Sequence, residues 1–148
     1  MKKSYRTLEF SFIQDYIKNY CFSEMAKKRI DQIQPFQDID DLKLYQDDIS
    51  SAMKIIYAYG RIPLAPYEDI KEILQKAQKG GVCYPQDLLK IVQILKNVQE
   101  VQAYLDQEIE QSHLLEILSL LYLPKDLYNE ILKCVDPSGN IYDHASHE

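Results

Sequence analysis

Apolar residues recur at intervals of three and four along almost the whole chain of 148 residues, and this spacing is the strongest constraint on its fold. Side chains three and four positions apart lie on one face of an α-helix. No stretch alternates apolar and polar residues for long enough to form a strand of a sheet. The sequence therefore predicts an all-α fold, an irregular bundle of about seven helices.

Residues that cap or break helices indicate where these helices begin and end. The hydroxyl of Ser23 can accept a hydrogen bond from a free amide in a first helical turn, and a longer helix begins at Asp38. Gly60 suits the left-handed position that ends a helix, and Pro85 suits a first turn. Helices are therefore predicted over about residues 10–20, 23–34, 38–59, 70–79, 85–105, 114–121 and 124–132, with a turn at 136–140 and a short extended piece at 141–142.

The first two helices are expected to form a hairpin, and the apolar stripes of the helices are expected to supply the core. One face of the first helix carries Phe12, Ile13, Tyr16, Ile17 and Tyr20, and the second helix turns Met25, Ala26, Ile30 and Ile33 inward. The buried stripe of the helix after Asp38 is predicted to be Leu42, Tyr45, Ile49, Ala52, Met53, Ile56 and Tyr57. The helix at 114–121 is apolar on more than one side, which predicts a central place in the core.

The size of the chain and its cysteines indicate one domain in a reducing compartment. A chain of this length can bury roughly 68–70% of its unfolded surface, so residues 1–148 are predicted to form a single domain without disulfides or metal. Cys21, Cys83 and Cys134 form no CxxC pair and follow no secretory leader, which predicts reduced thiols and a cytoplasmic protein. The most apolar stretch, residues 114–123, is too short for a membrane span of about 20 residues.

Charged side chains are distributed unevenly between the two halves of the chain, and this distribution limits where nucleic acid could bind. The chain has 17 basic and 23 acidic side chains, and residues 80–148 carry 4 basic and 11 acidic ones. Non-specific binding to nucleic acid depends on Lys and Arg, so only the first half offers candidates for it. These are Lys2, Lys3 and Arg6 around Tyr5, and the run Lys27, Lys28 and Arg29. A basic terminus and a solvated helix face are the favoured interpretations of both groups.

Motifs that carry catalytic chemistry are absent. The sequence contains no GxxxxGK[ST] loop for nucleotide phosphates, no GxSxG elbow and no HExxH helix. Asp143, His144 and His147 have a spacing at which they can bind a metal ion, but a turn beside the chain end favours solvated side chains. No catalytic, cofactor-binding or metal-binding residue is therefore assigned.

Twelve tyrosines and no tryptophan distinguish the composition. Tyrosine is favoured at half-buried seams and at protein interfaces, because its ring is apolar and its hydroxyl needs a partner. Tyr57, Tyr59, Tyr67 and Tyr84 flank the loop and helix ends in the middle of the chain. They are predicted to line the boundary of the domain's own core, and a docking surface is the alternative.

Several short motifs follow one another in a characteristic order between residues 8 and 146. The earlier ones are Leu8-Glu9-Phe10-x-x-Ile13, Cys21-x-Ser23-Glu24-x-Ala26, Ile33-Gln34-Pro35, Ser51-Ala52, Pro63-Leu64, Asp69-Ile70 and Lys76-Ala77-x-Lys79-Gly80-Gly81-Val82. The most specific one is Asp136-x-x-Gly139-x-Ile141-x-Asp143-x-Ala145-Ser146. In this order the motifs resemble the N-terminal core region of the MutS-II branch of bacterial MutS-like proteins. The sequence departs from that family at Ala65-Pro66, where glycines are usual.

The resemblance implies a fold similar to the MutS core domain, in a chain that is part of a longer ATPase. That protein would continue from about Glu148 into a lever and clamp, a P-loop ATPase and commonly an Smr endonuclease module. ATP and Mg²⁺ are expected in the downstream ATPase, and no cofactor in residues 1–148. Family members are implicated in binding branched DNA, suppressing recombination and splitting collided ribosomes, usually as homodimers. The implied partners of this region are thus the clamp and the ATPase of the longer protein, called here the parent. The parent is expected to bind branched DNA, ribosomes or both, and no contact with a membrane is expected.

The leading hypothesis is a non-catalytic helical domain that links the clamp and the ATPase of a MutS-II-like protein. The alternative is a stand-alone helical adaptor that binds a protein through its tyrosine-rich middle. A small metal-dependent hydrolase that uses Asp143, His144 and His147 is the third hypothesis.

Overall fold

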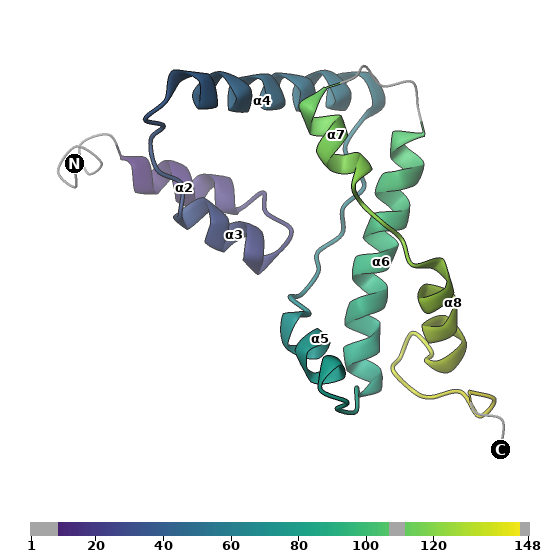
Figure 1. The fold of residues 1–148 in the computed structure, drawn as a ribbon. Helices are drawn as coiled ribbons and strands as arrows, with labels where there is room; N and C mark the ends of the chain where they lie inside the picture. Colours follow the sequence, from purple (N-terminus) through teal and green to yellow (C-terminus); the bar gives the residue numbers. More distant parts are fainter. Residues whose placement is uncertain (1–8, 107–111, 146–148) are drawn as a thin grey trace. The chain divides into compact units, whose positions relative to one another are not determined.

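The computed structural model describes residues 9–106 and 112–145, and within these ranges it contains seven helices and no β-strand (Figure 1). The prediction of an all-α helical fold is confirmed. The helices are α2 (Phe10–Lys18), α3 (Glu24–Asp31), α4 (Ile39–Tyr59), α5 (Lys71–Gln78), α6 (Pro85–Leu105), α7 (His113–Ser119) and α8 (Lys125–Cys134). None of the helices in the described part of the chain is long and apolar enough to cross a membrane.

The chain folds into two compact units. The first unit comprises Met1–Pro35 and Pro66–Asp69, and the second comprises Phe36–Ala65 and Ile70–Glu148. The single domain over residues 1–148 stays a prediction.

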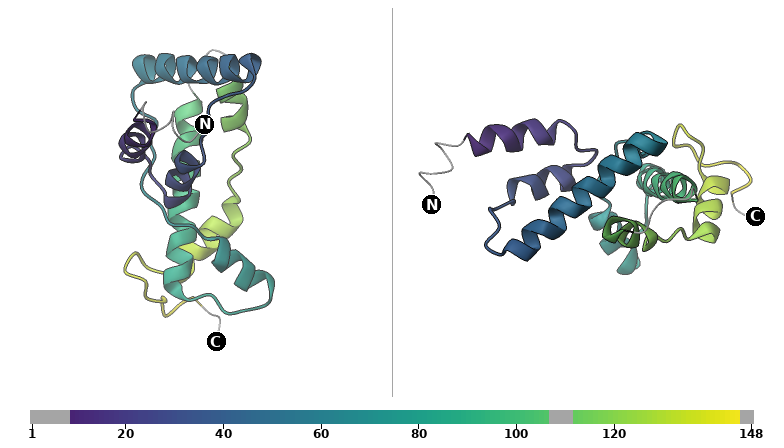
Figure 2. Two further views of the ribbon diagram at one scale, coloured as in Figure 1. Left: turned by 90° about the vertical axis from the view of Figure 1, so that its left-hand side faces the viewer. Right: turned by 90° about the horizontal axis from the view of Figure 1, so that it is seen from above.

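The first unit is built on the predicted hairpin of α2 and α3, which lie side by side (Figure 1, Figure 2). Gln14 Nε2 donates a hydrogen bond to the Ile30 carbonyl at 2.8 Å, and Lys18 forms an ion pair with Asp31. The predicted cap of α3 is also present, because the Ser23 hydroxyl accepts from the Ala26 amide at 3.1 Å. Sequence signals therefore identified both the pairing of these helices and the start of the second one.

The apolar stripes of this hairpin are not covered. Phe12, Tyr16 and Tyr20 of the first stripe are exposed, and so are Met25 and Ile33, which were expected to face inward. The expectation of inward positions for Met25 and Ile33 is wrong. Two helices of nine and eight residues cannot enclose a core between them, so their apolar faces remain at the surface.

The second unit has its core along α6. Leu95, Val101 and Tyr104 of this helix are buried, and α8 packs against it (Figure 1). The other buried apolar residues come from α4, from the segment before α8, and from α8 and its end: Ile55, Leu123, Ile131 and Val135. The 21-residue helix α6 is thus the element around which the unit is organised.

Helix α4 buries a different face from the one predicted. Tyr45 and Ile49 are 55% and 60% exposed, and Met53, Ile56 and Tyr57 are exposed as well. The inward face carries Asp48, Ser51 and the buried Ile55, at helical spacing, and of the predicted stripe only Leu42 and Ala52 are half-buried. The prediction is wrong for the five larger residues of the stripe, Tyr45, Ile49, Met53, Ile56 and Tyr57, because α7 packs on the side of α4 that carries shorter and more polar residues.

Helix α7 does not lie at the centre of the core either. Among its described residues none is buried, and Ile117 is exposed. The helix packs on α4, and Ile117 on another side of the helix remains exposed.

Several helix ends agree with the sequence signals. Asp38 caps α4, Pro85 opens α6, and α4 stops at Gly60. Gly60 has φ +83° and ψ −174°, so its φ is positive as predicted but its ψ is extended rather than left-handed helical. That combination is accessible essentially to glycine alone. Residue 141 forms the predicted extended piece as a single antiparallel bridge with Val135.

Candidate functional site

The polar side chains of α6 form the main candidate site, because they hold the main chain of two connecting segments. Asn97 is buried, and its Nδ2 donates to the Ala65 carbonyl at 2.9 Å while its Oδ1 accepts from the Ala65 amide at 3.0 Å. The main-chain amide and carbonyl of Ala65, in the segment after α4, thus both have a hydrogen-bond partner. A buried amide paired in this way fixes the position of that segment on α6.

Two further side chains of α6 act in the same way. The Tyr104 hydroxyl donates to the Gly60 carbonyl at 2.8 Å, and Gln102 Nε2 donates to the Leu121 carbonyl at 2.8 Å. Burial raises the pKa of the Tyr104 phenol, and the nearby Tyr59 adds to the shift. Asn97, Gln102 and Tyr104, called here the α6 anchors, therefore attach α6 to the segment after α4 and to the segment after α7.

Sequence reasoning missed the anchoring role of these residues. None of the three residues was singled out from the sequence. A signal was present, since Asn97 follows Ile94 by three residues and precedes Val101 by four, which places it on the same face of a long helix as these apolar residues. A polar side chain at such a position needs a hydrogen-bond partner when it is buried.

A polar contact also joins α7 to α4. The Nδ1 atom of His113, the first residue of α7, lies 2.9 Å from Asp48 Oδ1 and 3.0 Å from Oδ2. Ser112 caps the same helix by accepting from the Leu115 amide at 3.2 Å. The start of α7 is therefore fixed both to its own first turn and to α4.

The most specific family motif corresponds to a closed turn after α8. Asp136 Oδ1 accepts from the amides of Ser138 at 2.8 Å and Asn140 at 2.9 Å, and Oδ2 accepts from Asn140 Nδ2 at 3.1 Å. Hydrogen bonds from the Asn140 amide and side chain, then from the Ser138 and Gly139 amides, lower the pKa of Asp136. Gly139 has φ +85°, which favours glycine at this position. The Asp136–Asn140 part of the motif thus has a structural explanation.

The residues considered for metal binding do not form a site in the described part of the chain. Asp143 and His144 are exposed, His144 stacks on Tyr142 with ring centroids 5.1 Å apart, and His147 lies outside the described residues. Within residues 9–106 and 112–145 no group of three or more His, Cys, Asp or Glu side chains is placed to hold a metal ion. That no metal binds to this chain stays a prediction.

The basic residues considered for nucleic-acid contact fall into two groups. Lys2, Lys3, Tyr5 and Arg6 lie outside the described residues. In α3, Lys27 forms an ion pair with Glu24 at 2.6 Å, and hydrogen bonding to Lys27 lowers the pKa of Glu24. An exposed ion pair of this kind contributes little to stability. Lys27 therefore agrees with the interpretation of a solvated helix face.

The four central tyrosines are divided between the two units. Tyr67 belongs to the first unit, where its amide donates to the Phe22 carbonyl at 3.2 Å. The other three belong to the second unit, where Tyr57 is 82% exposed and Lys76 Nζ lies 4.4 Å from the centre of the Tyr84 ring. A docking surface made by all four stays a prediction.

Comparison with known proteins gives relatives along nearly the whole chain, although no family model matches it. A relative from Clostridium botulinum (strain Alaska E43 / Type E3) is 30% identical over 148 residues, which are 98% of this chain and 19% of the relative. One from Halothermothrix orenii is 31% identical over 154 residues, with 98% and 20% covered. One from Bacillus velezensis is 26% identical over 153 residues, with 98% and 19% covered.

These matches place the chain among the bacterial MutS-like proteins, as its motifs indicated. All three relatives are named endonuclease MutS2, so the chain corresponds to one part of a MutS2-type protein. It spans about a fifth of the length of the curated relatives that it matches.

Proposed function

We propose that this chain is a non-catalytic helical core domain that links the clamp and the ATPase of a MutS2-type protein. The observation that carries the proposal is the set of α6 anchors. Asn97 and Tyr104 hold the segment after α4, and Gln102 holds the segment after α7, all on one helix of 21 residues. Displacement of α6 would therefore move the flanking segments with it.

The distribution of apolar surface supports a place inside a larger protein. The exposed stripe of α4 includes Tyr45, Ile49 and Met53, which a self-contained domain would cover. The relatives are about five times as long as the region they share with this chain. Contact with other domains of the same protein would remove such a stripe from water.

The activities of the parent belong to this proposal as well. The parent is proposed to bind ATP and Mg²⁺ in a downstream domain, to act on branched DNA or on collided ribosomes as a homodimer, and to have endonuclease activity. It is proposed to work in the cytoplasm. Residues 80–148 carry 11 acidic and 4 basic side chains, so this part of the chain repels phosphate and need not touch nucleic acid itself.

Two measurements test the non-catalytic part. The purified chain, supplied with Mg²⁺, Mn²⁺ or Zn²⁺, is expected to hydrolyse no ATP and to bind a four-way DNA junction weakly, with an affinity that falls as salt rises. Turnover that co-purifies with the chain and is lost on a single substitution within it would contradict the proposal.

The linking part is tested in the long protein. Asn97→Ala is expected to leave nucleotide binding intact and to reduce the effect of ATP on DNA or ribosome affinity. The exposed Asn129→Ala serves as the matched control. Unchanged coupling in folded Asn97→Ala would refute the linking role.

A stand-alone adaptor is the second candidate function, and the exposure of Tyr57 and Tyr84 favours it. The reading frame beyond Glu148 separates the two candidates. A long helical region followed by a GxxxxGK[ST] motif supports the core domain, and a stop codon supports the adaptor.

A further inference from the structure

The chain passes between its two units at residues 35–36, 65–66 and 69–70. At the second of these crossings, Ala65 belongs to the second unit, while Pro66 and Tyr67 belong to the first. Main-chain groups on both sides of this crossing are held by hydrogen bonds, each within its own unit. The crossing at 65–66 can therefore be analysed torsion by torsion.

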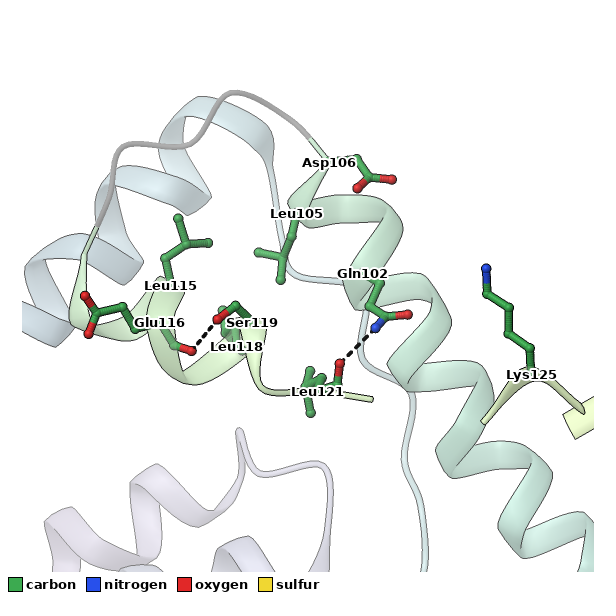
Figure 3. A pocket seen from close by; sticks show the side chains of 9 residues that line it. All are labelled: Gln102, Leu105, Asp106, Leu115, Glu116, Leu118, Ser119, Leu121 and Lys125. Atoms are coloured by element: carbon green, nitrogen blue, oxygen red, sulfur yellow. Dashed lines mark hydrogen bonds between the residues drawn. The ribbon is translucent and has the colours of Figure 1, made fainter. Parts of the chain in front are cut away.

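On the side of the second unit, Asn97 of α6 holds the main chain. It donates to the Ala65 carbonyl at 2.9 Å and accepts from the Ala65 amide at 3.0 Å. Because a peptide bond is planar, the bond to the carbonyl fixes the whole plane that leads to the nitrogen and Cα of Pro66. Figure 3 shows that Gln102 of the same helix holds the Leu121 carbonyl in a similar way, at 2.8 Å. The peptide plane before Pro66 therefore moves with α6.

On the side of the first unit, the hairpin of α2 and α3 holds the next peptide plane. The Tyr67 amide donates to the Phe22 carbonyl at 3.2 Å, in the connection between the two helices. Pro66 and Tyr67 also line a cavity of about 460 Å³ together with Phe22 and Ser23, so this segment lies along the start of α3. The peptide plane after Pro66 therefore moves with the hairpin.

Two main-chain torsions separate these two planes, the φ and the ψ of Pro66. The pyrrolidine ring holds φ at about −65°, which leaves rotation about the Cα–C bond as the remaining freedom. Pro66 is exposed, so a substitution there changes the torsions without removing a buried side chain.

We propose that residues 65–67 form a joint that confines rotation between the two units, at this crossing, to one main-chain torsion. The joint connects α6 to the hairpin through Asn97 and Ala65 on one side and through Tyr67 and Phe22 on the other. It depends on the fold of this chain alone and is independent of the proposed linking role.

Distances between spin labels on the two units test the joint. The native thiols are first replaced by alanine, at Cys21, Cys83 and Cys134. Nitroxide labels are then attached at exposed positions, through Ser11→Cys on α2 and Gln99→Cys on α6, and double electron–electron resonance measures the distribution of distances between them. Pro66→Gly frees φ as well as ψ and is expected to widen this distribution at least about 1.5-fold, with Pro66→Ala in between.

Pro137→Gly is the matched control, because Pro137 is an exposed proline inside the second unit. A second label pair, Gln99→Cys with Asn129→Cys on α8, lies within the second unit and reports whether this unit keeps its fold. Equal widths in the original chain and in Pro66→Gly overturn the proposal. A widening that Pro137→Gly reproduces, or that also appears in the second label pair, overturns it as well.

The contact of Asn97 with Ala65 supplies an independent readout. Asn97→Ala releases the peptide plane before Pro66 and is expected to widen the distribution between the units. Tyr104→Phe releases Gly60 instead and is expected to leave the distribution unchanged. Equal widening by the two variants overturns the joint. Because the chain is measured alone and without nucleotide, this outcome is separate from the effect of ATP that tests the linking role.

Discussion

The side-chain amide of Asn97 forms two hydrogen bonds with the main chain of Ala65, one through Nδ2 at 2.9 Å and one through Oδ1 at 3.0 Å. The two residues are 32 positions apart, and this contact fixes the segment that leads from α4 to Ala65 against the middle of α6. The amide and the carbonyl of Ala65 lose contact with water on folding, and the side chain of Asn97 supplies a hydrogen-bond partner for both.

Asn97→Ala is expected to destabilise the chain by about 1–3 kcal/mol, because it removes two hydrogen bonds to the half-buried main chain of Ala65, each of which usually contributes about 0.5–1.5 kcal/mol. Urea unfolding followed by circular dichroism measures the change. Asn129→Ala, on the exposed side of α8, is expected to change stability by less than about 0.5 kcal/mol. Similar losses in both variants would show that the Ala65 contact contributes nothing specific.

Tyr104→Phe removes the hydroxyl that donates to the Gly60 carbonyl at 2.8 Å and keeps the buried ring. The expected loss is about 0.5–1.5 kcal/mol, the usual net contribution of a single hydrogen bond. Thermal unfolding measures it, with Tyr122→Phe at the surface as the control. A variant as stable as the original chain would mean that water replaces the lost contact.

Asp136 is expected to make the turn after α8 sensitive to acid. Hydrogen bonds to its carboxylate lower its pKa from the ordinary value of 3.8, so its stabilising effect is complete above that value and is lost as the pH falls through the folded-state pKa. The stability difference between the original chain and Asp136→Asn should therefore shrink as the pH is lowered from 6 toward 3.

Urea unfolding at several pH values tests this expectation for Asp136. Ser138→Ala is the control that should keep the pH dependence, because Ser138 contributes its main-chain amide to the turn. A difference between the original chain and Asp136→Asn that stays constant over this range would rule out the carboxylate as the cause.

Ser23→Ala is expected to loosen the start of α3. Its buried hydroxyl accepts from the Ala26 amide at 3.1 Å, and loss of such a cap costs about 0.5–2 kcal/mol. Hydrogen exchange of the first-turn amides of α3 should accelerate, while Ser11→Ala on the exposed face of α2 should leave it unchanged. Equal exchange in the two variants would contradict a capping role.

The sequence was sufficient to predict where the helices lie. Ser23, Asp38, Gly60 and Pro85 act locally, within one turn of their own position, so their effect can be recognised without knowledge of the tertiary structure. The turn at 136–140 was predicted for the same reason. These are the parts of the fold that agree most closely with the prediction.

The buried faces of the helices could not be predicted in the same way. Periodicity in α4 identifies a stripe that includes Tyr45 and Ile49, but it contains no information on which side another helix will approach. The approach of α7 depends on a contact between His113 and Asp48, which are 65 positions apart. The α6 anchors were missed for the same reason, since their partners are main-chain carbonyls, which every residue possesses, and one main-chain amide, which every residue but proline possesses.

Attachment through main-chain atoms has an evolutionary consequence for the connecting segments. Asn97, Gln102 and Tyr104 recognise a carbonyl or an amide at Ala65, Leu121 and Gly60, so none of these bonds depends on the side chain that the partner carries. Substitutions should therefore be tolerated at Leu121 and, apart from proline, at Ala65, whereas Gly60 is restricted by its backbone conformation and the three tethering residues by their hydrogen bonds.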